Sequence, residues 1–218
     1  TRYIGVTGVQ TCALPICLAD QFHLFYLDTG AVYRTVAKHI LDTGRDPDDV
    51  EAAVSAARFV QDNLSWDMIE DPALRTDIVA DATSRSCRFP AMREIITDTL
   101  RQYANHPPLK HSHKPFQGAI LDGRDIGTVV CPDANVKLYV TASTDIRAER
   151  RFKELTLKGI HTSYEAVLKD MLDRDARDSG RETSPLRPAA DAIILDTSVL
   201  NADAAFDTAT DIIRNRLL

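Results

Sequence analysis

The sequence has no surplus of positive charge. Among its 218 residues, 26 lysines and arginines are outnumbered by 32 aspartates and glutamates, which gives a formal net charge of −6. A net negative field disfavours nucleic acids and anionic membranes, so an anion must be bound by a local cluster of cations. No apolar run approaches the length of a membrane-spanning helix, and the N-terminus lacks a basic region followed by an apolar one. We therefore expect a cytoplasmic monomer that binds small molecules.

Cysteine is also scarce. The four cysteines show no C-x-x-C spacing, so neither a disulfide framework nor a zinc site can be inferred from them. They are Cys12, Cys17, Cys87 and Cys131. His111 and His113 could bind a metal, but no third ligand lies near them in the sequence, and solvated loop histidines are the simpler interpretation. We therefore expect a reducing compartment and no metal site built from side chains.

What the sequence does contain is a regular alternation of short apolar runs and amphipathic stretches. Runs typical of strands occur at residues 24–27, 119–121, 136–141 and 192–195, and helical spacing fills the intervals. This alternation predicts an α/β fold with a doubly wound parallel sheet and helices on both faces. Ligands of such sheets bind beyond the carboxyl ends of the strands. We expect residues 67–71 to form an irregular link.

The most informative segment contains Asp122, Gly123, Arg124 and Asp125. An apolar run ends at Asp122, a glycine corner follows, and Gly127 then precedes a β-branched run. A buried strand that ends in this way presents charged side chains at the mouth of a site. The planar fork of Arg124 suits phosphate, and Asp125 can orient that fork or accept from a sugar hydroxyl or an exocyclic amine. The alternative is an ordinary ion pair in a surface turn.

Two further arginines lie one turn inside expected helices. Arg34 follows the turn that carries Thr29, and the two side chains would form a hydroxyl and guanidinium pair suited to phosphate. A capping threonine beside a solvated arginine is the alternative. Arg93 has a similar place after Pro90, at the start of another helix. Both arginines are therefore candidates for anion binding.

A late helix carries alternating charge. Thr162 and Glu165 form a capping-box pattern at its start. Its expected apolar face consists of Val167, Leu168, Met171 and Leu172. Arg174, Asp178 and Arg181 follow at i, i+4 and i+7, so two guanidinium groups and a carboxylate share one face and can converge on one ligand. The alternative is a solvated helix surface whose charges pair with one another.

The first residues have a different character from the rest. Residues 6–16 match, letter for letter, the translation in one frame of a common short-read sequencing adapter, and residues 1–5 fit its upstream part and variable index. We therefore interpret residues 1–16 as non-native and expect the genuine chain to begin near Cys17. The alternative is a natural β-strand at residues 3–7 followed by a turn at Gly8.

Three motifs in register resemble bacterial cytidylate kinases. They are YLDTGAVYR at residues 26–34, LDGRDIGTVV at 121–130, and RDARDSGR at 174–181 with PLRP at 185–188. Order and spacing agree across essentially all of residues 18–218. The resemblance implies a P-loop nucleoside-monophosphate kinase fold with a helical lid. It also implies transfer of the γ-phosphoryl group of ATP to CMP or dCMP with Mg²⁺, giving CDP or dCDP.

The same resemblance implies a division of the chain. Residues 17–218 would form a single kinase domain. Its monophosphate-binding region, residues 45–115, is reduced, because no hairpin is recognisable between residues 59 and 75. Residues 150–169 would form the lid.

The resemblance further implies roles for particular side chains. Contacts to the phosphate and sugar of the nucleotide are implied for Thr29, Arg34, Arg93, Arg124, Arg174 and Arg181. Reading of the cytosine and its surroundings is implied for Ser84, Arg93 and Asp125, and Asp178 would hold the ribose. Arg150 and Arg151 would place positive charge over the transferring phosphate, and with Arg174 they are the candidate catalytic residues. Phosphoryl transfer needs mainly positioning and neutralisation of charge, which arginine forks supply.

One segment departs from the family pattern. The family has GxxxxGK followed by Ser or Thr between the first strand and the first helix, where backbone N–H groups and the lysine bind phosphates and the hydroxyl binds magnesium. Residues 8–16 occupy that place without a lysine. We therefore expect ATP binding and turnover by this chain to be absent or grossly impaired. A nucleotide-binding pseudoenzyme with a naturally degenerate loop, or another small-molecule kinase of the P-loop superfamily, are the alternatives.

Overall fold

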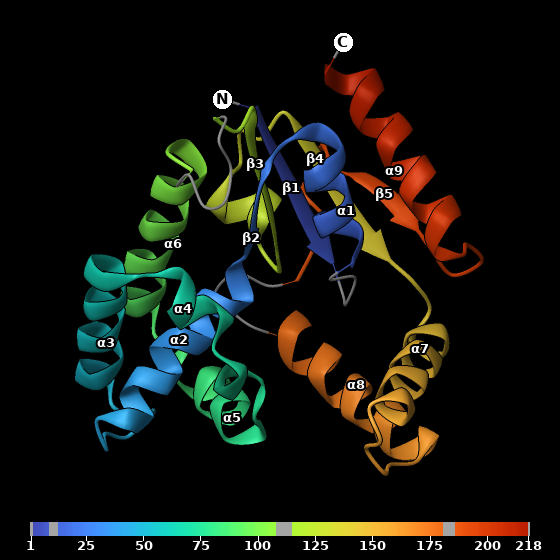
Figure 1. Ribbon diagram of the computed structural model, residues 1–218. Helices are drawn as coiled ribbons and strands as arrows, with labels where there is room; N and C mark the ends of the chain where they lie inside the picture. Colours follow the sequence, from blue (N-terminus) through green and yellow to red (C-terminus); the bar gives the residue numbers. More distant parts are fainter. Residues whose placement is uncertain (1, 9–12, 108–114, 181–185, 218) are drawn as a thin grey trace.

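The computed structural model of the chain describes residues 2–8, 13–107, 115–180 and 186–217. Within these residues, five strands form one sheet in the order β2-β3-β1-β4-β5, and all neighbouring strands are parallel (Figure 1). The strands are β1 (Arg2–Gly8), β2 (Phe25–Asp28), β3 (Gly118–Gly123), β4 (Val136–Thr141) and β5 (Ile193–Asp196). The predicted α/β fold with a parallel sheet is confirmed.

The helices fill the intervals between the strands. They are α1 (Ala13–Phe22), α2 (Thr29–Asp42), α3 (Val50–Asn63), α4 (Trp66–Glu70), α5 (Asp77–Ser86), α6 (Pro90–Asn105), α7 (Thr144–Leu157), α8 (Tyr164–Ser179) and α9 (Ala202–Leu217). A short 3₁₀ turn, η1 (Pro72–Arg75), lies between α4 and α5. No helix among the described residues is long and apolar enough to cross a membrane.

Each face of the sheet is covered by its own apolar core. Successive residues of a strand point to opposite faces. Accordingly, Leu121 packs with residues of α2, α3 and α6, whereas Ile120 packs with residues of α1 and α9. Both side chains are fully buried. The sheet is therefore a fixed platform, and its strands end on the side where α2, α7 and α8 lie (Figure 1).

Two local expectations were wrong. Residues 67–71 were expected to form an irregular link, but the structure has helix α4 there, and Ser65 caps it by accepting from the Met68 N–H at 3.4 Å. A helix of five residues is too short to show a period in the sequence. The capping residue of α8 is Ser163, not Thr162, because its hydroxyl accepts from the Ala166 N–H at 3.2 Å.

The β-branched run after Gly127 forms no strand. Residues Ile126–Val130 make a single π-helical turn, η2, in which the Asp125 carbonyl accepts from the Val130 N–H at 3.2 Å. Such turns are rare and concentrate at functional sites. This one fixes the backbone of Asp125 directly after the end of β3.

Helices α7 and α8 form a pair with an apolar cluster of its own (Figure 1). Ala148 of α7 packs against Val167 and Met171 of α8. Leu172, expected on the same apolar face, is 51% exposed, since one partner helix covers only part of the stripe. The predicted lid, residues 150–169, runs from α7 through the connecting loop into α8.

Strand β1 lies in the middle of the sheet, between β3 and β4. It belongs to the segment that we interpret as non-native, and α1 crosses the boundary at residue 17. A β-forming sequence of this length can occupy a central strand position whatever its origin. The origin of residues 1–16 therefore stays a prediction.

Candidate functional site

The carboxyl ends of β2 and β3 bring two sequence motifs together. Asp28 and Asp122 are partners in the parallel register, and the hydroxyl of Thr29 donates to the Asp122 carbonyl at 2.7 Å. This close approach requires the glycine at position 123, because a Cβ there would overlap the Thr29 hydroxyl. The predicted proximity of the 26–34 and 121–130 motifs follows from this pairing.

Arg34 and Arg124 both lie at these strand ends. Arg34 Nη2 contacts Asp28 Oδ2 at 2.8 Å, and Arg124 Nη1 donates to the Gly8 carbonyl at 3.0 Å. Burial and the charge of Asp28 raise the pKa of the Asp122 carboxyl, and the positive charges of both guanidinium groups offset only part of this rise. Two predicted phosphate contacts thus lie at the carboxyl ends of neighbouring strands.

Asp122 itself was not singled out as a site residue. Burial is the main influence on this carboxyl, followed by the neighbouring charge of Asp28, and together they raise its pKa to about 7. The hydrogen bond from Tyr26 and the two arginines act in the opposite direction. A visible signal was the acid that follows the apolar run in both strands, Asp28 in β2 and Asp122 in β3. The sequence shows these two acids but does not show that their strands pair.

Arg93 and Asp125 form a buried ion pair. Arg93 Nη2 contacts Asp125 Oδ2 at 2.6 Å, and the two residues are 7% and 3% exposed. The Arg93 guanidinium lies over the ring of Tyr33, 5.2 Å from the centroid. Burial raises the pKa of the Tyr33 hydroxyl, which keeps it protonated. The sequence suggested both charged residues separately but not their pairing or the role of Tyr33.

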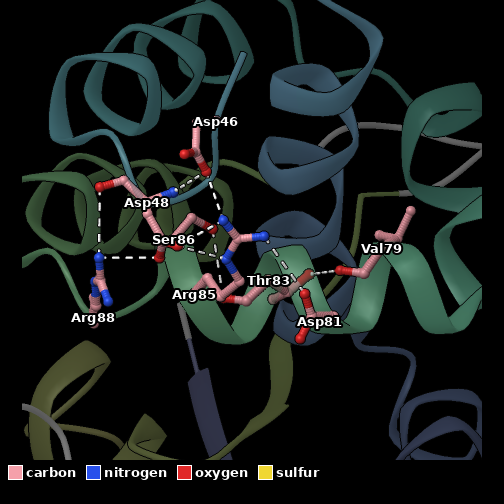
Figure 2. Close-up of polar contacts among 8 residues, drawn as sticks. All are labelled: Asp46, Asp48, Val79, Asp81, Thr83, Arg85, Ser86 and Arg88. Atoms are coloured by element: carbon pink, nitrogen blue, oxygen red, sulfur yellow. Dashed lines mark hydrogen bonds and ion pairs between the residues drawn. The ribbon is translucent and has the colours of Figure 1, made fainter. Parts of the chain in front are cut away.

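Ser84 lies near the end of α5, and the next residue, Arg85, belongs to a charged cluster (Figure 2). The neighbouring Arg85 contacts Asp46 and Asp48, both at 2.6 Å, and Asp81 of its own helix at 3.7 Å. Through these contacts the loop before α3 is joined to α5. The hydroxyl of Ser84 itself stays a predicted contact.

The two lid arginines have partners within the protein. Arg150 donates to the carbonyls of Thr197 and Leu200, at 2.6 and 3.1 Å, which joins α7 to the segment after β5. Arg151 contacts Glu154 one turn further along α7 at 2.8 Å. Both guanidinium groups thus contact parts of α7 or of the segment after β5, and the predicted catalytic roles stay predictions.

Several predicted residues lie outside the described part of the structure. The backbone of α8 includes positions 174 and 178, but the side chains of Arg174 and Asp178 are not described. Arg181 and the histidine pair at 111 and 113 lie outside the described residues altogether. Among the described residues, no group of three or more His, Cys, Asp or Glu could hold a metal ion.

The segment after β1 does not fit an ATP phosphate site with magnesium. Where the family pattern has Gly, Lys and a hydroxyl residue, helix α1 begins with Ala13, Leu14 and Pro15. Leu14 is buried in the core, 8% exposed. These side chains offer neither the cation nor the magnesium-binding hydroxyl that a phosphoryl donor requires.

Two surface hollows lie elsewhere. One of about 230 Å³ is lined by residues that include Tyr3, Arg101 and Cys131, and one of about 430 Å³ by residues that include Gln21 and Arg214. None of the strand-end residues lines either hollow. The candidate site is thus defined by its charges and hydrogen bonds.

Comparison with known proteins agrees with the resemblance in the motifs. The family model described as cytidylate kinase matches residues 6–215. A cytidylate kinase of Rhodospirillum rubrum is 45% identical over 91% of this chain and 89% of its own length, and one of Paramagnetospirillum magneticum is 48% identical over 91% and 90%. One of Methylocella silvestris is 44% identical over 91% and 86%. With a helix-flanked parallel sheet consistent with the P-loop nucleoside-monophosphate kinase fold, the chain belongs to the cytidylate kinase family.

Proposed function

We propose that the protein binds CMP or dCMP as a phosphoryl acceptor at the carboxyl ends of β2 and β3. In the family reaction, ATP would donate the γ-phosphoryl group, giving CDP or dCDP. The observation that carries the proposal is that Arg34, Arg124 and the N-terminus of α2 all lie at the carboxyl ends of the neighbouring strands β2 and β3. Guanidinium forks and a helix N-terminus are the groups that bind a phosphate dianion best.

The buried pair next to this site suits cytosine. Asp125 offers an acceptor for the exocyclic amine of the base, and Arg93 offers donors for its ring nitrogen and carbonyl oxygen. Uracil has a carbonyl in place of the amine, so it would face the carboxylate with a second acceptor. A buried site built for one donor and acceptor pattern rejects the wrong pattern strongly.

The residues of this chain would then have the following roles in binding the acceptor and closing the site. Thr29, Arg34 and Arg124 orient and neutralise the phosphate of the acceptor, while the Arg93 and Asp125 pair fixes the base. The helix pair α7 and α8 would close over the site, bring Arg150 and Arg151 with it and exclude water. Arg174, Asp178 and Arg181 would add contacts to the sugar and phosphate.

We propose further that this chain turns over poorly, because the segment after β1 lacks the phosphoryl-donor groups. Gly8 is in the correct register for the missing motif, so Ala13→Gly, Leu14→Lys and Pro15→Thr together restore GxxxxGKT. We expect a coupled ADP-release assay with CMP to show little turnover for the unchanged chain and a gain for the triple variant. Normal turnover of the unchanged chain would overturn this part of the proposal.

Substrate class is tested by binding. We expect CMP to raise the thermal unfolding midpoint more than UMP, AMP or GMP. Equal shifts with all four nucleotides would favour another kinase of the superfamily.

Resequencing of the source locus tests the origin of residues 1–16, since an intact GxxxxGK motif upstream of Leu18 excludes a natural pseudoenzyme. Sedimentation tests whether the protein is a monomer, and fractionation of the source cells whether it is cytoplasmic.

A further inference from the structure

The π-helical turn η2 holds Asp125 by its backbone. The carbonyl of this residue accepts from the N–H groups of Thr128, Val129 and Val130, at 3.3, 2.8 and 3.2 Å. Asp125 is therefore fixed from the end of the turn as well as from the end of β3. In the proposed function its carboxylate binds the exocyclic amine of cytosine. A shift of η2 would move the group that distinguishes cytosine from uracil.

The carbonyl groups at the end of η2 have a partner on α6. Arg101 Nε donates to the Val130 carbonyl at 2.9 Å, and Arg101 Nη2 donates to the Val129 carbonyl at 2.8 Å. The last carbonyls of a helical turn have no partner within the turn, and an arginine side chain can supply the missing donors. Because both donors belong to one planar fork, the guanidinium holds the two peptide groups at a fixed spacing.

Helix α6 thus holds Asp125 and its turn at two places. Near the start of the helix, Arg93 contacts the Asp125 carboxylate at 2.6 Å. Arg101 lies further along the same helix, about 12 Å from Arg93 in the axial direction, and holds the far end of the turn. The side chain and the backbone of Asp125 are therefore fixed relative to one rigid element.

The two arginines of α6 differ in exposure. The side chain of Arg93 is 9% exposed and that of Arg101 is 44% exposed. Arg101 also contacts Asp98, one turn earlier on the helix surface, at 3.3 Å. Ile126 and Val130 of η2 are buried in the core. Loss of Arg101 would leave the turn attached through these apolar side chains, while its backbone would be free to shift.

We infer that Arg101 is a positioning residue for the base: it fixes η2 from the surface of the protein, so that the Asp125 carboxylate meets the exocyclic amine of cytosine. This inference rests on the proposed binding of CMP. Arg101 acts through Asp125, without contact to the nucleotide, and contributes to the preference for CMP over UMP. A displacement of about 1 Å in a positioned group can cost about 100-fold, so a loosened turn has a measurable effect.

The preference is measured as the ratio of the Kd for UMP to the Kd for CMP, by calorimetric titration of the full chain with each nucleotide. We expect Arg101→Met to raise the Kd for CMP about tenfold and the Kd for UMP less than about twofold, because uracil offers no amine to Asp125. The ratio should therefore fall about fivefold or more. A merely structural role of Arg101 would weaken the binding of both nucleotides alike and leave the ratio unchanged.

Two control variants separate the carbonyl contacts from other effects of Arg101. Arg58→Met, at an exposed position of α3, controls for the loss of one positive charge and should keep the ratio. Asp98→Asn removes the exposed contact to Arg101 and leaves both carbonyl contacts, so it should also keep the ratio. Hydrogen exchange reports on the turn itself: the amides of Val129 and Val130 should exchange faster in Arg101→Met than in either control.

Arg101→Lys provides an independent test if Arg101→Met does not fold. An ammonium group is a point charge and cannot hold both carbonyls as a planar fork does, so the ratio should again be lower than in the unchanged chain. CMP binding with an unaltered ratio in the Arg101 variants that fold would overturn the inference and leave the proposed function intact. An equal fall in Asp98→Asn would also overturn it, and absence of CMP binding by the unchanged chain would overturn both.

Discussion

Two arginine clusters in this protein have the same contact distance and different surroundings. Arg93 contacts Asp125 at 2.6 Å in the interior, where the two side chains are 9% and 4% exposed. Arg85 contacts Asp46 at the same 2.6 Å, but those side chains are 38% and 65% exposed (Figure 2). The exposed arginine makes more ion pairs than the buried one, because Arg85 also contacts Asp48 and Asp81.

The difference shows that burial, more than distance, decides what an ion pair does. Water and salt weaken the exposed contacts, so each contributes little to the free energy of unfolding. The buried pair cannot exchange its partner for water, and removal of one member leaves an uncompensated charge in the interior. A rigid donor and acceptor pair of this kind suits base recognition, whereas the exposed cluster suits the attachment of a loop.

The largest effect is expected for Asp125→Asn. The substitution leaves Arg93 buried without its counter-charge, so we expect a loss of about 3 to 5 kcal/mol in the free energy of unfolding. Urea denaturation measures it, with Asp48→Asn in the exposed cluster as the matched control. Similar losses in the two variants would contradict the comparison.

Asp122→Asn tests how a buried carboxyl changes the pH dependence of the free energy of unfolding. The pKa of Asp122 is raised to about 7 in the folded protein, so between about pH 4 and pH 7 the native state binds more protons than the unfolded state. The contribution of this carboxyl to stability is therefore full below about pH 4 and is lost as the pH rises to 7. We expect the variant to lack this fall, and to gain roughly 2 to 4 kcal/mol over wild type between pH 4 and pH 8. If the free energies of unfolding of the variant and the wild type change with pH in parallel, the raised pKa of Asp122 makes no contribution to stability.

An intermediate effect is expected for Arg147→Met. Arg147 contacts Asp175 at 2.6 Å and joins α7 to α8, and the two side chains are 9% and 26% exposed. Because one partner is partly solvated and can be rehydrated, we expect a loss of about 1 to 2 kcal/mol. Native-state hydrogen exchange in α7 and α8 is the direct readout. A loss as large as that of Asp125→Asn would show that partial exposure does not matter.

The smallest effect is expected for Arg85→Ala. Its partners are exposed, so the urea midpoint should fall slightly at low salt and not at all in about 1 M NaCl, where screening is nearly complete. Arg58→Ala on the exposed face of α3 serves as the control. A fall that persists in high salt would mean that the cluster contributes through packing.

The sequence predicted the sheet well and the site only in part. The strands at β2, β3, β4 and β5 were predictable because each is a short apolar run between helical stretches. The pairing of Asp28 with Asp122 was not, since strand order is set by tertiary packing and leaves no local pattern. For the same reason Arg93 and Asp125 were recognised singly and not as a buried pair.

Short elements were the other failure. Helix α4 and the π-helical turn η2 are each five residues long, too short for a period to be recognised. The β-branched residues Val129 and Val130 favour strands locally, but the hydrogen bonds to Asp125 and Ile126 impose a turn. Such conflicts between local preference and tertiary structure concentrate at functional sites.

Calorimetric titration with CMP of the unchanged chain and of Arg34→Met tests the central claim, that the arginines at the ends of β2 and β3 bind a nucleoside monophosphate. Arg75→Met, at an exposed arginine of η1, is the matched control. We expect CMP to bind the unchanged chain and the control equally, and to bind Arg34→Met roughly 10- to 100-fold more weakly, because charge-assisted hydrogen bonds to the phosphate are lost. Equal affinities of all three proteins for CMP, or no binding by any, would contradict the account.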